Sequence, residues 1–176
     1  MHWMLLPLRR YAEFSGRSRR MEYWMFFLFQ MLIGVAFWVL MAIAGGSALM
    51  MGGGDPSALA AAGGFVMILF ALYGLISLAL FIPALAVTVR RLHDTNRTGW
   101  WVLAPIVGYV ILIAGTVMAA SSPDNPGTGG ILALVGGLTV FILALVLLVF
   151  MFLEGTRGPN NYGPDPKGEA LDKVFA

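Results

Sequence analysis

The hydrophobic positions along the chain fall into four long runs separated by short polar or glycine-rich segments. Residues 23–44, 64–89, 100–120 and 131–153 each supply the roughly 20 apolar residues that a helix needs to cross a bilayer. Inside lipid, every backbone N–H and C=O group must be bonded within the protein, so only helices and closed barrels span. Barrel strands alternate apolar and polar residues, whereas the stretch from Phe141 to Leu153 is apolar on every face. The pattern therefore predicts an all-α membrane protein with four transmembrane helices in a bundle.

The segments outside these runs divide the chain into three parts. Residues 45–63 are rich in glycine, and residues 121–130 read SSPDNPGTGG, so both are expected to be connections. We expect a basic N-terminal segment at residues 1–22, a four-span domain at 23–153 and a polar tail at 154–176. The first run is longer than the 7–15-residue core of a signal peptide, so we expect it to be retained as a span.

The composition supports a lipid environment. Apolar residues make up 59% of the chain and charged residues 11%, against about 45–50% and 25% in soluble domains. Too few polar residues remain to cover a globule of this size in water. The chain contains no cysteine, which excludes disulfides, thiolate metal sites and cysteine nucleophiles.

The positive charges predict the orientation in the membrane. Lysine and arginine are absent from residues 45–63 and 121–130, whose charges are Asp55 and Asp124. Short loops rich in lysine and arginine stay in the cytoplasm, so the N-terminus, the middle connection and the C-terminus are all expected there. The basic residues in these three segments are Arg9, Arg10, Arg17, Arg19, Arg20, Arg90, Arg91, Arg97, Arg157, Lys167 and Lys173.

Small residues and prolines give weaker signals about helix packing. Pairs four positions apart, which let two helices approach closely, occur at Ala104 and Gly108, Gly115 and Ala119, and Ala133 and Gly137. Pro83 lies inside the second run and predicts a kink, whereas Pro105 predicts either a kink or a first-turn proline.

Three polar motifs stand out, and all three are expected on the cytoplasmic side. They read FSGRSRRMEYW at residues 14–24, RRLHDTNRTGWW at 90–101 and EGTRGPNNYGPDP at 154–166. In this order, they resemble the YhaH-type bacterial inner-membrane proteins, which form domain-of-unknown-function family eight hundred and five. The resemblance covers residues 14–166. It implies a small multi-span protein of the bacterial inner (cytoplasmic) membrane and implies no reaction, ligand or cofactor.

The motifs supply a candidate cluster of polar side chains. One interpretation is anchoring, in which arginines near the surface attract anionic headgroups with about 1 kcal/mol each. Asp94 would then pair with Arg90 or Arg91, or with an arginine of another motif, and Glu22 with an arginine of the middle connection. The other interpretation is a pocket for an anionic group, because arginine suits phosphate and carboxylate. The candidate residues are Arg17, Arg20, Glu22, Arg90, Arg91, His93, Asp94, Arg97, Asn161 and Tyr162.

These observations favour a structural or accessory membrane protein that binds lipid, through anionic headgroups, or a protein partner. An enzyme is disfavoured because the chain has no H-E-x-x-H, G-x-S-x-G or phosphate-binding glycine loop. An oligomeric transporter or channel is the alternative, although the four runs contain no ionisable residue other than tyrosine. With His2 and His93 as the only histidines, we expect no metal and no other cofactor. Nucleic acid is not an expected partner, whereas a homo-oligomer or a membrane-protein partner stays open.

Overall fold

The computed structural model describes residues 2–51, 56–122 and 127–168. Its described part is helical, with four helices long and apolar enough to cross a membrane, which confirms the predicted all-α architecture. The predicted turns at residues 52–55 and 123–126, and Lys173 in the tail, lie outside the described residues. The elements are α1 (His2–Arg9), α2 (Arg20–Met51), α3 (Pro56–Asp94), the 3₁₀ helix η1 (Gly99–Leu103), α4 (Ala104–Ser121) and α5 (Gly127–Phe152).

Helices α2 and α3 are longer than the hydrophobic runs that predict them. Most of the expected connection at residues 45–63 is helical, including Gly45 and Gly46 in α2. The alanine and methionine residues around these glycines have high helix propensity, and Pro56 suits the first turn of α3, where its missing N–H costs nothing. Because of the glycine content of this segment, the predicted end of α2 is too early and the predicted start of α3 is too late.

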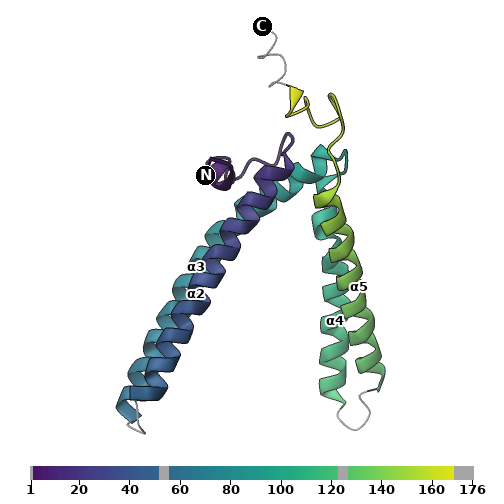
Figure 1. Ribbon diagram of the computed structural model, residues 1–176. Helices are drawn as coiled ribbons and strands as arrows, with labels where there is room; N and C mark the ends of the chain where they lie inside the picture. The colour runs from purple at the N-terminus through teal and green to yellow at the C-terminus, as the bar shows by residue number, and fades with distance from the viewer. Residues whose placement is uncertain (1, 52–55, 123–126, 169–176) are drawn as a thin grey trace. The chain divides into compact units, whose positions relative to one another are not determined.

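The chain forms two compact units, and α2 and α3 each contribute to both. The first unit comprises Met1–Glu13 and Trp24–Ala86. Within it, α2 and α3 lie side by side (Figure 1). The Phe37 ring of α2 stacks on Tyr73 of α3 at 4.2 Å between centroids, and the Tyr11 hydroxyl donates to the Ala79 carbonyl at 2.6 Å. Aromatic packing thus joins the two helices of this unit.

The second unit comprises Phe14–Tyr23 and Val87–Ala176. Its helices α4 and α5 run antiparallel, so that Gly108 lies against Val140, Leu112 against Gly136 and Gly115 against Ala133. A Cβ added at Gly108 would come within 2.6 Å of the Val140 nitrogen. The glycines therefore allow the two backbones to touch, as in other membrane helix pairs.

The predicted small-residue positions are partly correct. Gly108, Gly115, Ala119 and Ala133 all lie in the contact between α4 and α5. Gly137 does not, since nothing lies within 4 Å of a Cβ added there, and its neighbour Gly136 takes the contact position. The sequence spacing identified the right helices but not the contacting face of α5.

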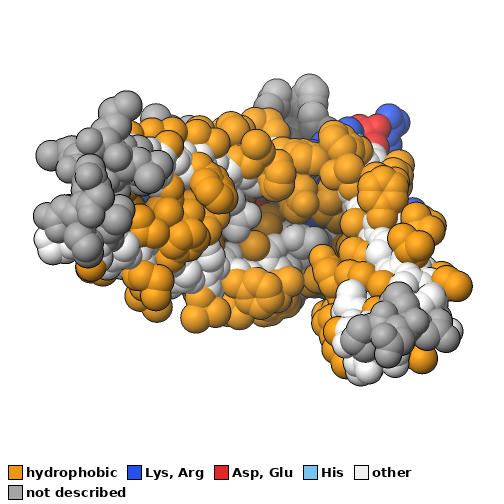
Figure 2. Space-filling view, turned by 90° about the horizontal axis from the view of Figure 1, so that it is seen from below, with side chains coloured by type: hydrophobic (Ala, Val, Ile, Leu, Met, Phe, Trp, Pro, Cys, Tyr) orange, Lys and Arg blue, Asp and Glu red, His pale blue; other side chains and the backbone are white. Residues whose placement is uncertain are grey.

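Apolar side chains cover the outside of the long helices. In each of the four apolar helices, at most 11% of the most hydrophobic stretch is buried inside the protein. The space-filling view shows hydrophobic side chains over much of the visible helical surface (Figure 2). A helix that exposes apolar residues all round is suited to lipid rather than water.

Helix α3 ends in a backbone motif that turns the chain toward η1. The Asn96 N–H donates to the His93 carbonyl at 3.0 Å and the Arg97 N–H to the Leu92 carbonyl at 2.9 Å. Asn96 takes the left-handed conformation, with φ of 58°. This is a Schellman arrangement, in which asparagine is the usual substitute for glycine. Pro105 lies in the first turn of α4, as one of its two predicted roles required.

Candidate functional site

The three polar motifs meet in the second unit, at the end where α3 and α5 finish. The Ser18 N–H donates to the Arg90 carbonyl at 3.1 Å, which joins the first motif to the second. The Thr156 N–H donates to the Asp94 carbonyl at 2.9 Å, which joins the third motif to the second. Segments separated by most of the chain thus form one polar cluster.

Arg17 lies at the centre of this cluster, with only 1% of its side chain exposed. Its Nε donates to Asp94 Oδ1 at 2.9 Å. Its Nη1 donates to the Gly158 carbonyl at 2.7 Å, and its Nη2 to the Thr156 carbonyl at 2.5 Å. One guanidinium therefore binds all three motifs together, using the fixed fork of donors that lysine lacks.

Asp94 holds a second buried arginine on its other oxygen. Arg91 Nη1 donates to Asp94 Oδ2, and the Arg91 side chain is fully buried. The backbone of Gly155 passes so close that a Cβ there would lie 2.8 Å from Asp94 Oδ1. Asp94 therefore pairs with Arg91 and with an arginine of another motif, both of which were among the predicted partners.

Arg91 and Arg20 cap the C-terminal end of α5. Arg91 Nε donates to the Met151 carbonyl at 3.3 Å, and Arg91 Nη2 donates to the Leu153 carbonyl. Arg20 Nη1 donates to the Phe152 carbonyl at 3.2 Å. The last carbonyls of a helix have no partner within it and carry partial negative charge, so cations are favourable there.

A third buried ion pair links α2 to α3. Arg90 Nη2 lies 2.7 Å from Glu22 Oε1, with side-chain exposures of 0% and 3%. This confirms the predicted pairing of Glu22 with an arginine of the middle connection. Arg90 and Arg91 are both buried, and their guanidinium groups make ion pairs within the protein.

His93 and Tyr162 lie together beside the arginine cluster. Their rings stack at 3.9 Å with an interplanar angle of 4°. Asn160 Nδ2 donates to the His93 carbonyl at 2.9 Å, which fixes the turn carrying Tyr162. The candidate residue Asn161 is exposed, and its neighbour Asn160 makes the hydrogen bond to the His93 carbonyl. The Arg97 guanidinium lies 4.0 Å above the centroid of the Phe150 ring.

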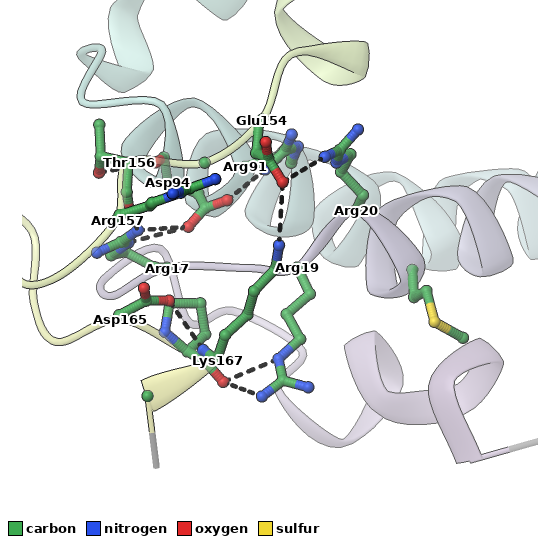
Figure 3. Close-up of a pocket in the computed structure, with 14 residues that line it drawn as sticks. Arg17, Arg19, Arg20, Arg91, Asp94, Glu154, Thr156, Arg157, Asp165 and Lys167 are labelled. Atoms are coloured by element: carbon green, nitrogen blue, oxygen red, sulfur yellow. Dashed lines mark hydrogen bonds and ion pairs between the residues drawn. The ribbon is translucent and has the colours of Figure 1, made fainter. Parts of the chain in front are cut away.

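A cavity of about 650 Å³ opens beside this cluster (Figure 3). Six cationic side chains and three carboxylates line it, so its lining carries an excess of three positive charges. The cations are Arg17, Arg19, Arg20, Arg91, Arg157 and Lys167, and the carboxylates are Asp94, Glu154 and Asp165.

The rim of the cavity is more exposed than its floor. Glu154 lies between Arg20 and Lys167, at 3.2 and 3.5 Å, and all three side chains are largely exposed (Figure 3). Arg19 Nε donates to the Pro166 carbonyl at 2.8 Å. Arg157 makes no hydrogen bond or ion pair with the residues that the structure describes.

Asp165 shapes the turn at the edge of the cavity. Its carboxylate accepts hydrogen bonds from the N–H groups of Lys167 at 2.9 Å and Gly158 at 3.1 Å. The Lys167 N–H is the main cause that lowers the pKa of Asp165 below its usual value. Asp165 therefore keeps its charge and holds the segment that carries Arg157 and Lys167.

Sequence reasoning missed five of the charged lining residues, namely Arg19, Glu154, Arg157, Asp165 and Lys167. Four of them belong to the last motif and its continuation, where charges of both signs follow the end of α5. That alternation of charge was the available signal. No group of three or more histidine, cysteine, aspartate or glutamate side chains that could hold a metal occurs in the described part of the chain.

Four apolar helices and a cluster of buried arginines at one end of a helix pair define a multi-pass α-helical membrane protein. The chain belongs to the family described as protein of unknown function (DUF805), which it matches over residues 11–164. The resemblance expected from the three motifs is thus confirmed.

Relatives of similar length support this membership. Inner membrane protein YhaI of Escherichia coli K12 is 34% identical over 95% of this chain and 97% of its own length. Inner membrane protein YhaH of the same strain is 32% identical over 96% of this chain and 99% of its own length. The protein is accordingly a multi-pass protein of the bacterial inner membrane. The uncharacterized protein YiiR is 32% identical over 47% of this chain. No solved structure matches the chain.

Proposed function

We propose that this protein is an accessory protein of the inner membrane that binds anionic lipid headgroups at its arginine-rich end, and that this end faces the cytoplasm. The observation that carries the proposal is the excess of three positive charges around a cavity of about 650 Å³. Basic pockets beside transmembrane helices on the cytoplasmic side are typical sites for anionic headgroups.

The position of the cavity along the helices suits a headgroup. Its lining includes Arg20, the first residue of α2, and Asp94, the last residue of α3. Glu154 follows the end of α5 by two residues. Where long apolar helices end, the hydrocarbon gives way to the layer of phosphates. A phosphate in that layer is therefore at the level of the cavity.

The distribution of charge supports the cytoplasmic orientation. Every lysine and arginine belongs to the terminal segments, to the first turn of α2, to the end of α3 or to the connection that follows it, and none to residues 45–63 or 121–130. This asymmetry is what the positive-inside rule describes. Anionic lipids also give the cytoplasmic leaflet a negative surface potential, which attracts such a cluster.

Lipid titration of the purified protein tests the proposal. We expect phosphatidylglycerol to bind, by native mass spectrometry, at lower concentration than phosphatidylcholine, and to raise the temperature of unfolding. The preference should shrink between about 0.05 and 0.5 M salt, because ions screen exposed charges. Equal binding of the two lipids would reject the proposed function.

A pair of double variants locates the binding. Replacing Arg157 and Lys167 with glutamine should weaken phosphatidylglycerol binding several-fold, because both side chains line the cavity. The control replaces Arg9 and Arg10, which lie outside it and carry the same total charge. Equal losses in the two double variants would indicate attraction to the surface in general rather than to the cavity.

A further inference from the structure

Glu154 occupies a place in the cavity that suits an anionic ligand. Its carboxylate lies between two cations, 3.2 Å from Arg20 and 3.5 Å from Lys167. The side chains of these three residues are 58%, 42% and 60% exposed, in that order. Exposed ion pairs of this kind add little stability. A more highly charged anion can therefore displace the carboxylate at small cost.

We infer that the cavity is a site for a group that carries two phosphates, which displaces Glu154 from Arg20 and Lys167 and also binds Arg157. The inference rests on the proposed function for the position of the cavity in the headgroup layer. It goes further in naming the ligand chemistry and the residues that exchange partners. The exchange involves charge-assisted hydrogen bonds only, and no covalent step.

The charges around the cavity favour two phosphates over one. Arg17 and Arg91 share the single carboxylate of Asp94, which leaves one positive charge on the floor. Arg20, Lys167 and Arg157 add three at the rim, and Arg19 adds one more. Glu154 and Asp165 reduce this total to three. One phosphodiester would neutralise a single charge, whereas a group with two phosphates carries at least two negative charges.

The size of the cavity points the same way. A single phosphate fills on the order of 100 Å³, about three waters' share of the liquid. The cavity measures about 650 Å³, within the roughly 300–1,000 Å³ of typical small-molecule sites. The rim cations come from two segments, Arg20 from the start of α2, and Arg157 and Lys167 from the chain after α5. Two phosphates can contact both segments at once.

Two sources can supply this chemistry, and the experiment separates them. One is a lipid headgroup with two phosphates, and the other is a soluble diphosphate. The full-length protein in detergent is titrated with cardiolipin, with phosphatidylglycerol and with inorganic pyrophosphate. We expect cardiolipin to bind about tenfold more tightly than phosphatidylglycerol and pyrophosphate to displace it.

Glu154→Gln supplies the sharper test, because it predicts a gain. Removing this carboxylate frees Arg20 and Lys167, so cardiolipin binding should become several-fold tighter. Glu13→Gln is the matched control, since Glu13 is also an exposed partner of an arginine, Arg10, outside the cavity. Both variants remove one negative charge, and Glu13→Gln should leave the affinity unchanged. Equal gains in both variants would overturn the inference.

Each remaining outcome decides between the two proposals. Phosphatidylglycerol binding as tightly as cardiolipin would overturn the inference and leave the proposed lipid function standing. Pyrophosphate binding in the absence of binding by either lipid would support the two-phosphate site and reject the lipid function. Unchanged cardiolipin affinity in Glu154→Gln, with the fold intact by its unfolding temperature, would contradict the exchange of partners.

Discussion

Asp94 compensates two buried arginines at once, because Arg17 binds one of its carboxylate oxygens and Arg91 binds the other. The three side chains are 6% exposed or less. A buried ion pair adds little net stability, but removing one member leaves an uncompensated charge in a poorly solvated place. The stability of the cluster therefore depends more on the negative charge of Asp94 than on any single hydrogen bond that Asp94 accepts.

Asp94→Asn tests this dependence with almost no change in size. The amide leaves Arg17 and Arg91 buried without a counter-ion, so we expect a loss of about 3–5 kcal/mol of stability. Unfolding of the purified variant in detergent, followed by circular dichroism against temperature, measures the loss. Glu13→Gln, which breaks an exposed pair with Arg10, should cost at most about 1 kcal/mol. A similar small loss in Asp94→Asn would contradict the assigned role.

The sequence revealed the charged partners at this scale but not the backbone acceptors. The pairing of Glu22 with an arginine of the middle connection, and that of Asp94 with an arginine, were predicted from the opposite charges that the three motifs carry. That Arg17 also binds the carbonyls of Thr156 and Gly158 could not be predicted, because every residue has a carbonyl. Asn160 and Asn161 are adjacent residues of the same type, so the sequence could not show which of them makes the contacts.

At the scale of the elements, the antiparallel contact of α4 and α5 depends on the face of each helix that carries glycine. Gly115 and Gly136 allow backbone to meet backbone, whereas Gly137 faces open space. The length of the hydrophobic runs predicted four apolar helices, and their described bounds lie near the predicted ones except between α2 and α3. A shift of one residue along α5 moves the contact to a different face of the helix. Because α5 is apolar on all sides, its sequence did not indicate which face contacts α4.

Gly136→Ala and Gly137→Ala make a matched pair for this contact. A Cβ at position 136 would collide with the backbone of Leu112, so we expect a loss of about 1–3 kcal/mol. A Cβ at position 137 meets nothing, and alanine should leave stability unchanged or raise it by up to about 1 kcal/mol. Thermal unfolding in the same detergent compares the two. Equal losses would place the contact on a different face of α5.

At the scale of the whole molecule, the proposed orientation places both ends of the chain and the cavity in the cytoplasm. The chain contains no cysteine, so single cysteines can report their side of the membrane without a background. Ser57 and Thr128 lie at the starts of α3 and α5, and Lys167 lies at the cavity rim. All three are exposed in the structure.

We expect a membrane-impermeant maleimide to label Ser57→Cys and Thr128→Cys in intact cells whose outer membrane has been made permeable. Lys167→Cys should react only after the inner membrane is broken, because the positive-inside rule places its segment in the cytoplasm. Labelling before and after lysis, detected as a mass shift on a gel, measures on which side of the inner membrane each cysteine lies. Labelling of Lys167→Cys in intact cells would reverse the proposed orientation.

The bonds of Arg17 have a consequence for how the protein is made. Its partners are residues 94, 156 and 158, so the first of these bonds must wait for the end of α3 and the others for the segment that follows α5. A ribosome delivers the N-terminus first. Arg17 and Arg91 therefore spend most of synthesis hydrated, and a nascent chain stopped before residue 154 has inserted helices but no closed polar cluster. Completion of the segment that follows α5, which carries the Thr156 and Gly158 carbonyls, is therefore the step that closes the cluster. We expect quality-control proteases to recognise an unclosed cluster as the mark of an unfinished protein.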